Sequence, residues 1–472
     1  MTRNLKNNEY ERQVSGAERF FSHSPFSTVT MVARIKGYVS EDMVKIAVEK
    51  AQQRHALLRT RISDAQKGKL RFTSSEVLEI PIEIVPRTSE NDWIEIHAER
   101  AKIPYEFEKR PAIRFILVHS TEVSELIILC HHMICDGMSL AYLARDLMVY
   151  LGDPMAEPQV LPAPKPISLD NLPSDVAPSG LIKYFINKIR QKWADEIVYF
   201  DQEDYAALNK AYWDNYQHQI LSVELSESET VDLVARCRKE KVTVNTALIT
   251  AFSGAQKFVV GEKPHHVKTV SAVSLRDRLP TSPGESIGYY ALGLEVKYKY
   301  SSNKTFWENA RIYHKKIMSN ISNKKVFGDL PSFLQMDSNI YEALSFKKLG
   351  ALVKPGSPRY KKLHSFSERQ DVVVRLLKRA KMETLEAKLM GSAITNLGRL
   401  NFPQTYGTLE LDRLIMQPGG AFPLVHVDMV LGVVTCGGKL SLVVEYAEEA
   451  VDTTTMKKIK AKAMDWLLKT QG

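Results

Sequence analysis

Apolar and polar positions along the first third of the chain follow strand-like and helix-like patterns in turn. Residues 27–37 are rich in β-branched side chains and predict a strand, and residues 112–132 predict two apolar strands joined by a polar turn. Apolar residues recur at helical spacing in 40–55, 91–102 and 137–152. Short strands are expected at LLRTRI, LRFTS and IPIEIV.

The pattern changes at 153–180, where Pro, Asp and Ser are frequent, which predicts a linker. A basic amphipathic stretch follows to about residue 216, and strand and helix patterns resume at 218. The later elements are expected as strands at 266–276, 287–298, 408–416, 424–435 and 439–446, with helices at 306–321 and 453–470. We therefore predict an α/β protein with mixed sheets, divided into an N-terminal lobe (1–178), a connecting helical segment (179–216) and a C-terminal lobe (217–472).

The composition indicates which classes of binding partner to expect. The chain has 472 residues, of which 44% are hydrophobic and 25% charged, as in ordinary globular proteins. Its net charge of +9 comes from scattered Lys and Arg, without the aromatic and basic motifs of RNA-binding modules, so nucleic acid is not expected as a partner. A phosphorylated co-substrate or an acidic acyl-carrier protein suits this charge.

The cysteine spacing and the lengths of the apolar runs argue against metal-binding, disulfide-stabilised and membrane-spanning classes of protein. Cys130, Cys135, Cys237 and Cys436 form no C-x-x-C pair, so we expect neither a zinc site nor a disulfide framework. Cys130 and Cys135 are expected as small packing residues. The N-terminus lacks the apolar run of a signal peptide, and no apolar stretch of about 18 residues occurs, so we expect a cytoplasmic protein without a transmembrane segment.

One stretch, HHMICDG at 131–137, combines residues suited to catalysis. It lies between a predicted strand and a predicted helix, where polar groups can face a pocket on a fixed backbone. An imidazole is the usual general base near neutral pH, and an acyl transfer needs a base to deprotonate the attacking hydroxyl or amine. Gly137 is expected to permit the bend, and Asp136 suits a helix N-terminus. No G-x-S-x-G motif indicates a covalent nucleophile.

Three other interpretations compete. A single histidine is usually a surface or core residue, but a doublet followed by x-x-x-D-G is rare by chance. His132 and Asp136 are four apart and could share a metal on a helix, yet the preceding strand and Gly137 disfavour a helix there. His131 and Asp136 also fit the H-x4-D pattern of glycerolipid acyltransferases, but the glycine and arginine phosphate-binding block of those enzymes is absent.

The stretch resembles the HHxxxDG motif of the chloramphenicol-acetyltransferase-like superfamily, which includes peptide-synthetase condensation domains and many acyltransferases. Four further segments resemble blocks of that superfamily in the same order: RHALLRTRI (54–62), VSLRDRL (273–279), ESIGYYALGLEV (285–296) and TNLGRL (395–400). The resemblance covers about 15–470. It implies two similar αβ lobes in a V-shaped pseudo-dimer, with a central tunnel and the catalytic histidine inside it.

The resemblance also implies roles for individual residues. His132 is expected to be the base, His131 to support it, and Asp136 to form a structural ion pair with Arg59. Asn396 is expected either to bind substrate or the oxyanion, or to be a turn residue before Gly398. Arg276 and Arg399 are expected as interface ion-pair residues or as ligands of a phosphopantetheine arm, and Tyr290 as a substrate-binding residue.

The sequence differs from the superfamily's patterns at several positions, and these differences favour its stand-alone acyltransferases. The plant BAHD motif DFGWG is absent, and Tyr289 and Tyr290 replace the Phe-Val of condensation domains. We expect a monomeric, stand-alone acyltransferase that moves an acyl group from acyl-CoA or a carrier-protein thioester to a small alcohol or amine, without a tightly bound cofactor. The alternatives are an amide-forming condensation enzyme and a non-catalytic relative that binds acyl groups or carrier proteins.

Overall fold

The computed structural model describes residues 10–22, 24–64, 68–176, 180–369, 391–420 and 426–469. The strands of this part of the chain form two six-stranded sheets and a three-stranded one. The N-terminal sheet contains, in spatial order, β12 (Thr405–Tyr406), β13 (Leu409–Gln417), β2 (Thr28–Lys36), β7 (Val123–His131), β6 (Ile113–His119) and β5 (Ile82–Pro86). The C-terminal sheet contains β10 (Ala291–Lys297), β9 (Lys268–Ser274), β11 (Gly391–Leu400), β14 (Val427–Cys436), β15 (Lys439–Ala447) and β8 (His218–Glu224). The small sheet contains β1 (Glu11–Gln13), β4 (Arg71–Thr73) and β3 (Arg61–Ser63).

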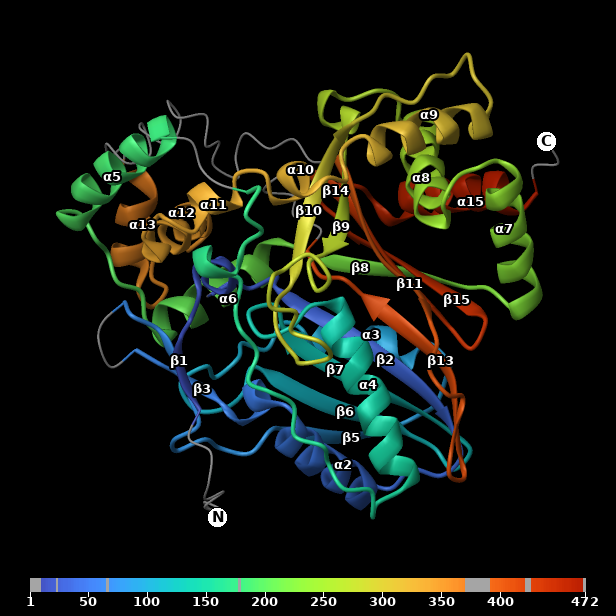
Figure 1. The fold of residues 1–472 in the computed structure, drawn as a ribbon, viewed down its shortest axis with the longest axis horizontal. Helices are drawn as coiled ribbons and strands as arrows, with labels where there is room; N and C mark the ends of the chain where they lie inside the picture. Colours follow the sequence, from blue (N-terminus) through green and yellow to red (C-terminus); the bar gives the residue numbers. More distant parts are fainter. Residues whose placement is uncertain are drawn as a thin grey trace.

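The helices fall into three groups around these sheets (Figure 1). The N-terminal lobe has α1 (Gly16–Arg19), α2 (Glu41–Arg54), α3 (Asp92–Arg100) and α4 (Gly137–Gly152). A lateral group contains α5 (Gly180–Ala194), α6 (Gln202–Asn215), α11 (Leu330–Phe333), α12 (Ser338–Gly350) and α13 (Tyr360–Glu368), and α10 (Asn323–Phe327) lies beside β10. The C-terminal lobe has α7 (Glu227–Lys239), α8 (Val244–Val260), α9 (Phe306–Met318) and α15 (Thr453–Leu468). Short 3-10 turns occupy Ala56–Arg59, Leu169–Asn171 and Pro264–Val267.

The register of the N-terminal sheet places the histidine motif where the central strand β7 ends and its neighbour β2 begins. β2 runs antiparallel to β7, with Thr28 opposite His131, so the start of one strand lies beside the end of the other. β13, from the C-terminal part of the chain, pairs with the opposite side of β2. The segment 217–472 therefore contributes to both sheets, and β13 ties the two lobes together through main-chain hydrogen bonds.

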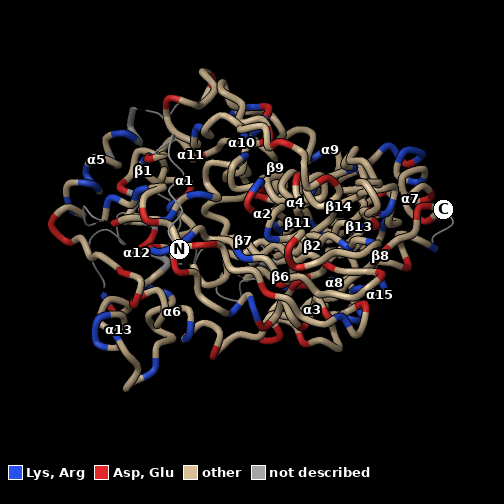
Figure 2. Tube along the Cα trace, turned by 90° about the horizontal axis from the view of Figure 1, so that it is seen from below, with Lys and Arg blue, Asp and Glu red and all other residues tan. Residues whose placement is uncertain are grey.

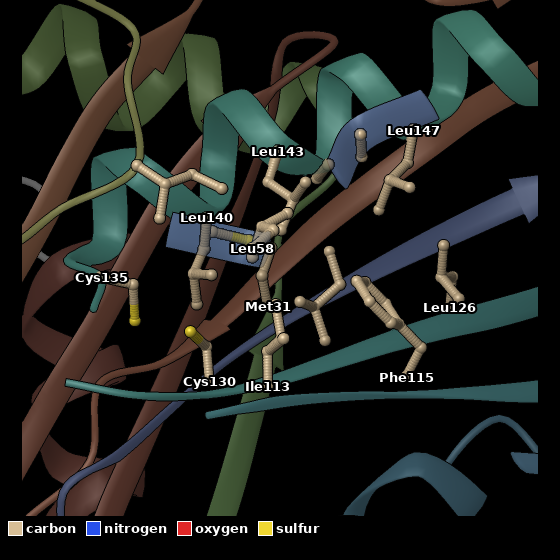
Figure 3. Packing of buried hydrophobic residues seen from close by; sticks show 14 of the residues in the cluster. Met31, Leu58, Ile113, Phe115, Leu126, Cys130, Cys135, Leu140, Leu143 and Leu147 are labelled. Atoms are coloured by element: carbon tan, nitrogen blue, oxygen red, sulfur yellow. The ribbon is translucent and has the colours of Figure 1, made fainter. Parts of the chain in front are cut away.

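A close-packed core lies between the N-terminal sheet and α4 (Figure 3). Met31, Leu126 and Cys130 project from the strands, and Leu140 and Leu143 project from the helix; all five are buried. The residues alternate along the strands and recur every three or four positions along the helix, which is why each element has one face for this core. This packing fixes the start of α4, and hence residue 136, against the sheet.

The cysteines are packing residues, as predicted. Cys130 and Cys135 lie in the core between sheet and α4, and Cys237 and Cys436 are also buried; all four are free thiols. Burial raises the pKa of the Cys135 thiol well above its usual range, so it stays protonated and apolar in character.

The other two helix groups have cores of their own. In the C-terminal lobe, α8 and α15 pack their apolar faces, including Phe252 and Met456, on β11, β14 and β15. The lateral group packs α5 and α6 against α12 and α13, with Trp193 and Phe346 buried among them. The predicted connecting segment 179–216 therefore packs on helices from the C-terminal part of the chain.

The predicted α/β class with mixed sheets is confirmed. β11 runs parallel to β9 and β14, while the other pairs of the C-terminal sheet are antiparallel. The stretch LLRTRI, expected as a strand, begins as a 3-10 turn and becomes a strand only at Arg61. The sequence pattern did not predict α12 and α13, and the predicted boundary at 178/179 falls outside the described residues.

Lys and Arg alternate with Asp and Glu along the chain rather than forming one basic block (Figure 2). No helix among the described residues is long and apolar enough to cross a membrane.

Candidate active site

His132 lies in a turn between β7 and α4. β7 ends at His131, residues 132–135 form the turn, and α4 begins at Gly137. The His132 N–H donates to the carbonyl of Ser27 at 2.7 Å, and the His131 N–H donates to the carbonyl of Ala112 at 2.9 Å. These main-chain bonds hold the turn to neighbouring segments on both sides, so the backbone that carries the His132 imidazole is fixed.

The hydrogen bond of the His132 ring selects one tautomer. Its Nδ1 lies 2.7 Å from the carbonyl oxygen of Cys135. Because a carbonyl oxygen only accepts, Nδ1 carries the proton, and in the neutral ring Nε2 has a free lone pair. Nε2 is therefore the atom that can accept a proton from a substrate.

Two aromatic rings flank the imidazole of His132. The ring of Phe21, which follows α1, lies with its centroid 4.4 Å away at an interplanar angle of 30°, and the ring of Tyr289, which precedes β10, lies 5.1 Å away at 89°. The two rings also touch each other, with centroids 4.7 Å apart. The imidazole thus stands between an N-terminal residue and a residue of the C-terminal lobe.

This environment sets the protonation of both polar rings. Burial lowers the pKa of His132 below its ordinary value, and the Cys135 carbonyl and the charge of Asp136 offset only part of that effect. His132 is therefore neutral at pH 7, as a general base must be. Burial also raises the pKa of the Tyr289 hydroxyl far above its usual value, so this group keeps its proton.

Asp136 is the N-cap of α4 and a cross-lobe ligand. Its Oδ1 accepts the N–H of Ser139 at 2.6 Å, as an N-cap carboxylate does, and its Oδ2 accepts the N–H of Tyr290 from the other lobe at 3.0 Å. The Arg276 guanidinium donates to Oδ1 at 3.1 Å. The carboxylate therefore joins the start of α4 to the segment that carries Tyr289.

The predicted partner of Asp136 was wrong. Arg276 forms the ion pair, and both partners are buried, at 4% and 3% exposure. Arg59 lies in the 3-10 turn after α2, half-buried, and among the described residues it makes no ion pair with Asp136. Through Nη1, Arg276 also donates to the carbonyls of Gly284 and Ser286, while its Nε has no hydrogen-bond partner among the described residues.

Ser139, one turn into α4, reinforces the contact between the lobes. Its hydroxyl donates to the carbonyl of Gly288 at 2.7 Å and accepts the Gly288 N–H at 3.1 Å. Arg276 donates to the same oxygen at 2.8 Å. Because Gly288 precedes Tyr289, these bonds fix the ring that faces His132. The sequence interpretation missed Ser139, although it lies three residues after Asp136.

A second ionic cluster lies further along α4. Arg54 and His55 of the RHALLRTRI segment contact Asp146 at 2.7 and 2.9 Å. Arg145 pairs with Glu285 of the C-terminal lobe at 2.6 Å, and Arg54 reaches the same carboxylate at 3.0 Å. Arg54 and His55 of this segment therefore tie the end of α2 to α4 at Asp146, while Arg59 takes no part in this cluster.

His131 supports the site from the opposite face of the strand. It is fully buried, and the rings of Tyr105 and Phe107 meet it edge-on at 5.4 and 4.9 Å. Its Nδ1 accepts the N–H of Met133 at 3.3 Å, which stabilises the turn that contains His132. The role predicted for His131, as a support of His132, stays a prediction.

The remaining predicted residues have structural contacts. The Tyr290 hydroxyl donates to the carbonyl of Lys165 at 2.7 Å, and its ring lies under the Arg276 guanidinium at 5.0 Å, so both of its polar groups are occupied within the protein. The Asn396 side chain accepts the N–H of Gly398 at 2.8 Å, which is the turn alternative. Arg399 is exposed.

Gly137 is needed for close packing rather than for a bend. Its backbone is not in the left-handed region. A Cβ atom there would lie 2.9 Å from Leu397 Cδ2 and 2.9 Å from Met416 Sδ. The predicted reason for this glycine was therefore wrong: β11 and β13 approach the first residue of α4 too closely for a side chain.

The described residues contain no group of three or more His, Cys, Asp or Glu side chains arranged to hold a metal ion. The chemistry available at the site is that of the neutral His132, with its proton acceptor at Nε2 and an aromatic wall on two sides. This arrangement can remove a proton from a hydroxyl or amine without a covalent enzyme intermediate.

Comparison with known proteins shows what the first third of the chain is similar to. Residues 13–162 match the family model described as the Condensation domain. The matched region contains β2, β7, the His132 turn and α4. This third of the chain is therefore similar in sequence to condensation domains. The superfamily resemblance carried by HHMICDG is therefore confirmed.

Curated relatives match a quarter to a third of the chain. A polyketide synthase-nonribosomal peptide synthetase of Aspergillus clavatus is 32% identical over 149 residues, which is 30% of this chain and 4% of the relative. The nonribosomal peptide synthetase agiA of Aspergillus flavus is 26% identical over 120 residues, 25% of this chain and 2% of the relative. The chain thus spans only a few per cent of the length of these relatives.

Solved structures extend the likeness to the whole chain at the level of fold. The TRI3 trichothecene 15-O-acetyltransferase of Fusarium sporotrichioides has a TM-score of 0.61 at 13% identity and covers 99% of this chain and 96% of its own. Polyketide synthase associated protein 5 of Mycobacterium tuberculosis has a TM-score of 0.59 at 15% identity, covering 98% of both chains. The condensation domain of the Monacolin K polyketide synthase MokA has a TM-score of 0.57 at 12% identity, covering 97% of this chain and 96% of its own. The chain has the condensation-domain fold.

Proposed function

We propose that the protein is an acyltransferase in which His132 is the general base. The observation that carries the proposal is the hydrogen bond from His132 Nδ1 to the Cys135 carbonyl, which leaves Nε2 as the proton acceptor. The lowered pKa of His132 keeps that atom unprotonated at neutral pH. The match of residues 13–162 to the condensation-domain model supports the assignment, because the match includes this turn.

The proposed reaction moves an acyl group from a thioester to a hydroxyl or amine. Nε2 of His132 takes the proton of the acceptor as its oxygen or nitrogen attacks the thioester carbonyl. The carbon–sulfur bond breaks, and the departing thiolate receives the proton that His132 holds. Each turnover therefore forms one ester or amide and one thiol, and returns His132 to its neutral state.

The donor is proposed to be acyl-CoA or an acyl-carrier-protein thioester, and the acceptor a small alcohol or amine. The tunnel implied by the family resemblance would lead the two substrates to His132 from opposite faces. Phe21 and Tyr289 stand on two sides of the ring, so both would contact whatever reaches Nε2. Tyr289 and Phe21 are accordingly proposed as walls of the reaction site.

The test compares thiol release by wild type, His132→Ala and His119→Ala with mixed acyl-CoAs and a panel of alcohols and amines, with products weighed by intact-mass spectrometry. His119 is a matched control because it ends β6 in the same sheet, outside the site. We expect His132→Ala to lose about 10²- to 10⁴-fold in rate, as loss of a general base does, while His119→Ala keeps the wild-type rate. Full activity of His132→Ala, with unchanged circular dichroism, would refute the proposal.

The same assay separates the alternatives. An amide-forming condensation enzyme would give products only with amines, and would still depend on His132. A relative that only binds acyl groups or carrier proteins would release no thiol with any donor and acceptor, although an acyl-CoA could bind. A neutral His132 whose Nε2 can accept a proton favours catalysis over binding alone.

A further inference from the structure

Tyr289 carries a hydrogen-bond donor beside the His132 imidazole that the protein itself does not use. Two rings contact that imidazole, those of Phe21 and Tyr289, and of the two only Tyr289 has a polar side-chain atom. Its hydroxyl makes no hydrogen bond within the described part of the chain. The side chain is half-buried, and its oxygen is accessible rather than enclosed. The hydroxyl is therefore available to a molecule that reaches His132.

The polar side chains that anchor this segment are engaged within the protein. The Ser139 hydroxyl donates to the carbonyl of Gly288 at 2.7 Å. The Arg276 guanidinium pairs with Asp136, and its one unbonded nitrogen, Nε, is enclosed. A carboxylate such as that of Asp136 only accepts hydrogen bonds. Of this group, Tyr289 is the side chain that can donate to a substrate.

The backbone holds Tyr289 in place from both sides. The Gly288 N–H donates to the Ser139 hydroxyl at 3.1 Å, and the Tyr290 N–H donates to Asp136 Oδ2 at 3.0 Å. Both partners belong to the first turn of α4, which follows the His132 turn directly. A donor held in this way needs little rearrangement when it binds, and this is the condition under which a hydrogen bond stabilises charge in a transition state.

The Tyr289 hydroxyl keeps its proton in this environment. Burial raises its pKa far above the ordinary value, and the charge of Asp136 raises it further. His132 is the opposite case, because burial lowers its pKa and leaves the ring neutral. The site therefore combines a neutral base with a neutral phenol that donates hydrogen bonds without losing its proton.

The proposed acyl transfer creates a charge that such a donor would stabilise. When the acceptor attacks the thioester, the electron pair of the carbonyl π bond moves to oxygen, which becomes negatively charged. The two ring nitrogens of His132 are occupied at that moment, Nε2 with the proton of the acceptor and Nδ1 with the carbonyl of Cys135. Another group must therefore donate to the developing oxyanion.

We propose that the Tyr289 hydroxyl donates a hydrogen bond to the carbonyl oxygen of the acyl thioester and to the oxyanion formed from it. No proton is transferred to that oxygen. The hydrogen bond strengthens as negative charge develops, and it weakens when the carbonyl forms again and the carbon–sulfur bond breaks. This role rests on the acyl transfer proposed for His132, and it makes Tyr289 a second catalytic residue, contributed by the C-terminal lobe.

The first test compares wild type with Tyr289→Phe in thiol release, using the fastest acyl-CoA and acceptor of the panel described for His132. We expect kcat to fall about 10²- to 10³-fold, as on loss of one oxyanion donor, with KM changed less than about threefold. The urea unfolding midpoint should not change, because the hydroxyl that is removed bonds no described protein group. Tyr38→Phe is the matched control: its ring is 57% exposed and lies outside the site, so kcat and KM should stay at wild-type values.

The second test examines the contact with the carbonyl oxygen directly. In a dithioester donor with the same acyl group, sulfur replaces that oxygen, and sulfur is a weak hydrogen-bond acceptor. Wild type should therefore lose more rate than Tyr289→Phe on changing from the thioester to the dithioester. Equal losses in the two proteins would overturn the proposal, and so would a raised KM with unchanged kcat in Tyr289→Phe, since that result would mean binding alone.

The outcomes separate this proposal from the one on which it rests. If Tyr289→Phe keeps the wild-type kcat while His132→Ala loses activity, the role of Tyr289 is refuted and the base assignment stands. If His132→Ala keeps full activity, or if wild type releases no thiol, the proposed function fails and the role of Tyr289 fails with it.

Discussion

The ion pair between Asp136 and Arg276 gives the sharpest prediction, because the sequence interpretation had chosen Arg59 instead. The change to Asn at 136 keeps an N-cap acceptor for Ser139 but removes the charge that faces Arg276. Removing one partner of a buried pair costs about 3–5 kcal/mol, because the other charge stays buried. Arg276 would keep its bonds to two carbonyls and to Ser139, which places the cost near the lower limit, about 3 kcal/mol.

The Arg276→Met change should cost a similar amount, since Asp136 keeps only the N–H groups of Ser139 and Tyr290. In the double variant neither buried charge is left unpaired, so its loss should be about 3–4 kcal/mol rather than the sum of about 6 kcal/mol. The cycle therefore predicts a coupling free energy of about 2–3 kcal/mol. The matching cycle of Asp136→Asn with Arg59→Met should be additive within about 0.5 kcal/mol.

The assay is urea unfolding of the four variants of each cycle, followed by near-UV circular dichroism, with the free energy of unfolding taken from the first transition. Arg59→Met is the internal control, because it removes the same charge from a half-buried position. If Asp136 couples to Arg59 and not to Arg276, the assignment of the ion pair is refuted.

Three more predictions follow from the contacts at the site. Because burial lowers the pKa of His132, the rise of kcat/KM with pH should have its inflection below the ordinary value of 6.5, with a plateau above it; an inflection above 6.5 would contradict this. Phe21→Ala admits water to the ring and should move that inflection upward and lower kcat/KM about tenfold, whereas Phe258→Ala, whose exposed ring meets Trp466 in the C-terminal lobe, should leave the inflection in place. Gly137→Ala should cost about 1–2 kcal/mol, seen as a lower melting temperature, because its Cβ would crowd Leu397 and Met416; an unchanged melting temperature would show that these side chains yield freely.

The local elements could be predicted from the sequence because their causes are local. Apolar periodicity and the Ser40 cap placed α2 within one residue at each end, and the observed cap bond runs from the Met43 N–H to Ser40. The richness of 27–37 in β-branched residues placed β2, and the glycine after Asp136 marked the first residue of α4. These signals need no knowledge of what lies across the lobe interface.

The contacts across the lobes could not be predicted in this way. Arg276 and Asp136 lie 140 positions apart in the chain, and nothing near either residue says that they meet. Both Arg54 and Arg59 belong to the RHALLRTRI segment, and only the packing of α2 on α4 decides that Arg54 faces Asp146. Phe21 escaped notice for the same reason, because its contact with His132 depends on where α1 packs.

The two ionic clusters on α4 explain why the motif extends from the end of a strand into a helix. In the first cluster, Asp136 pairs with Arg276, and Ser139 bonds the backbone of Gly288. In the second cluster, Asp146 pairs with Arg54, and Arg145 pairs with Glu285. Ser139 bonds Gly288 and Arg145 pairs with Glu285, so α4 contacts the same segment of the C-terminal lobe at two places along its length. That segment carries Tyr289, the ring that meets the His132 imidazole edge-on.

Buried ion pairs add little net stability, since desolvation offsets most of their attraction, but they strongly penalise any arrangement that separates the partners. In this protein the penalty falls on movements that shift residues 285–290 relative to α4, and such a shift would carry Tyr289 away from His132. The charged residues of the motif therefore act on the position of the lobes, while His132 is the proposed base. This division of labour requires that loss of Asp136 weaken activity and unfolding free energy together, whereas loss of His132 weakens activity alone.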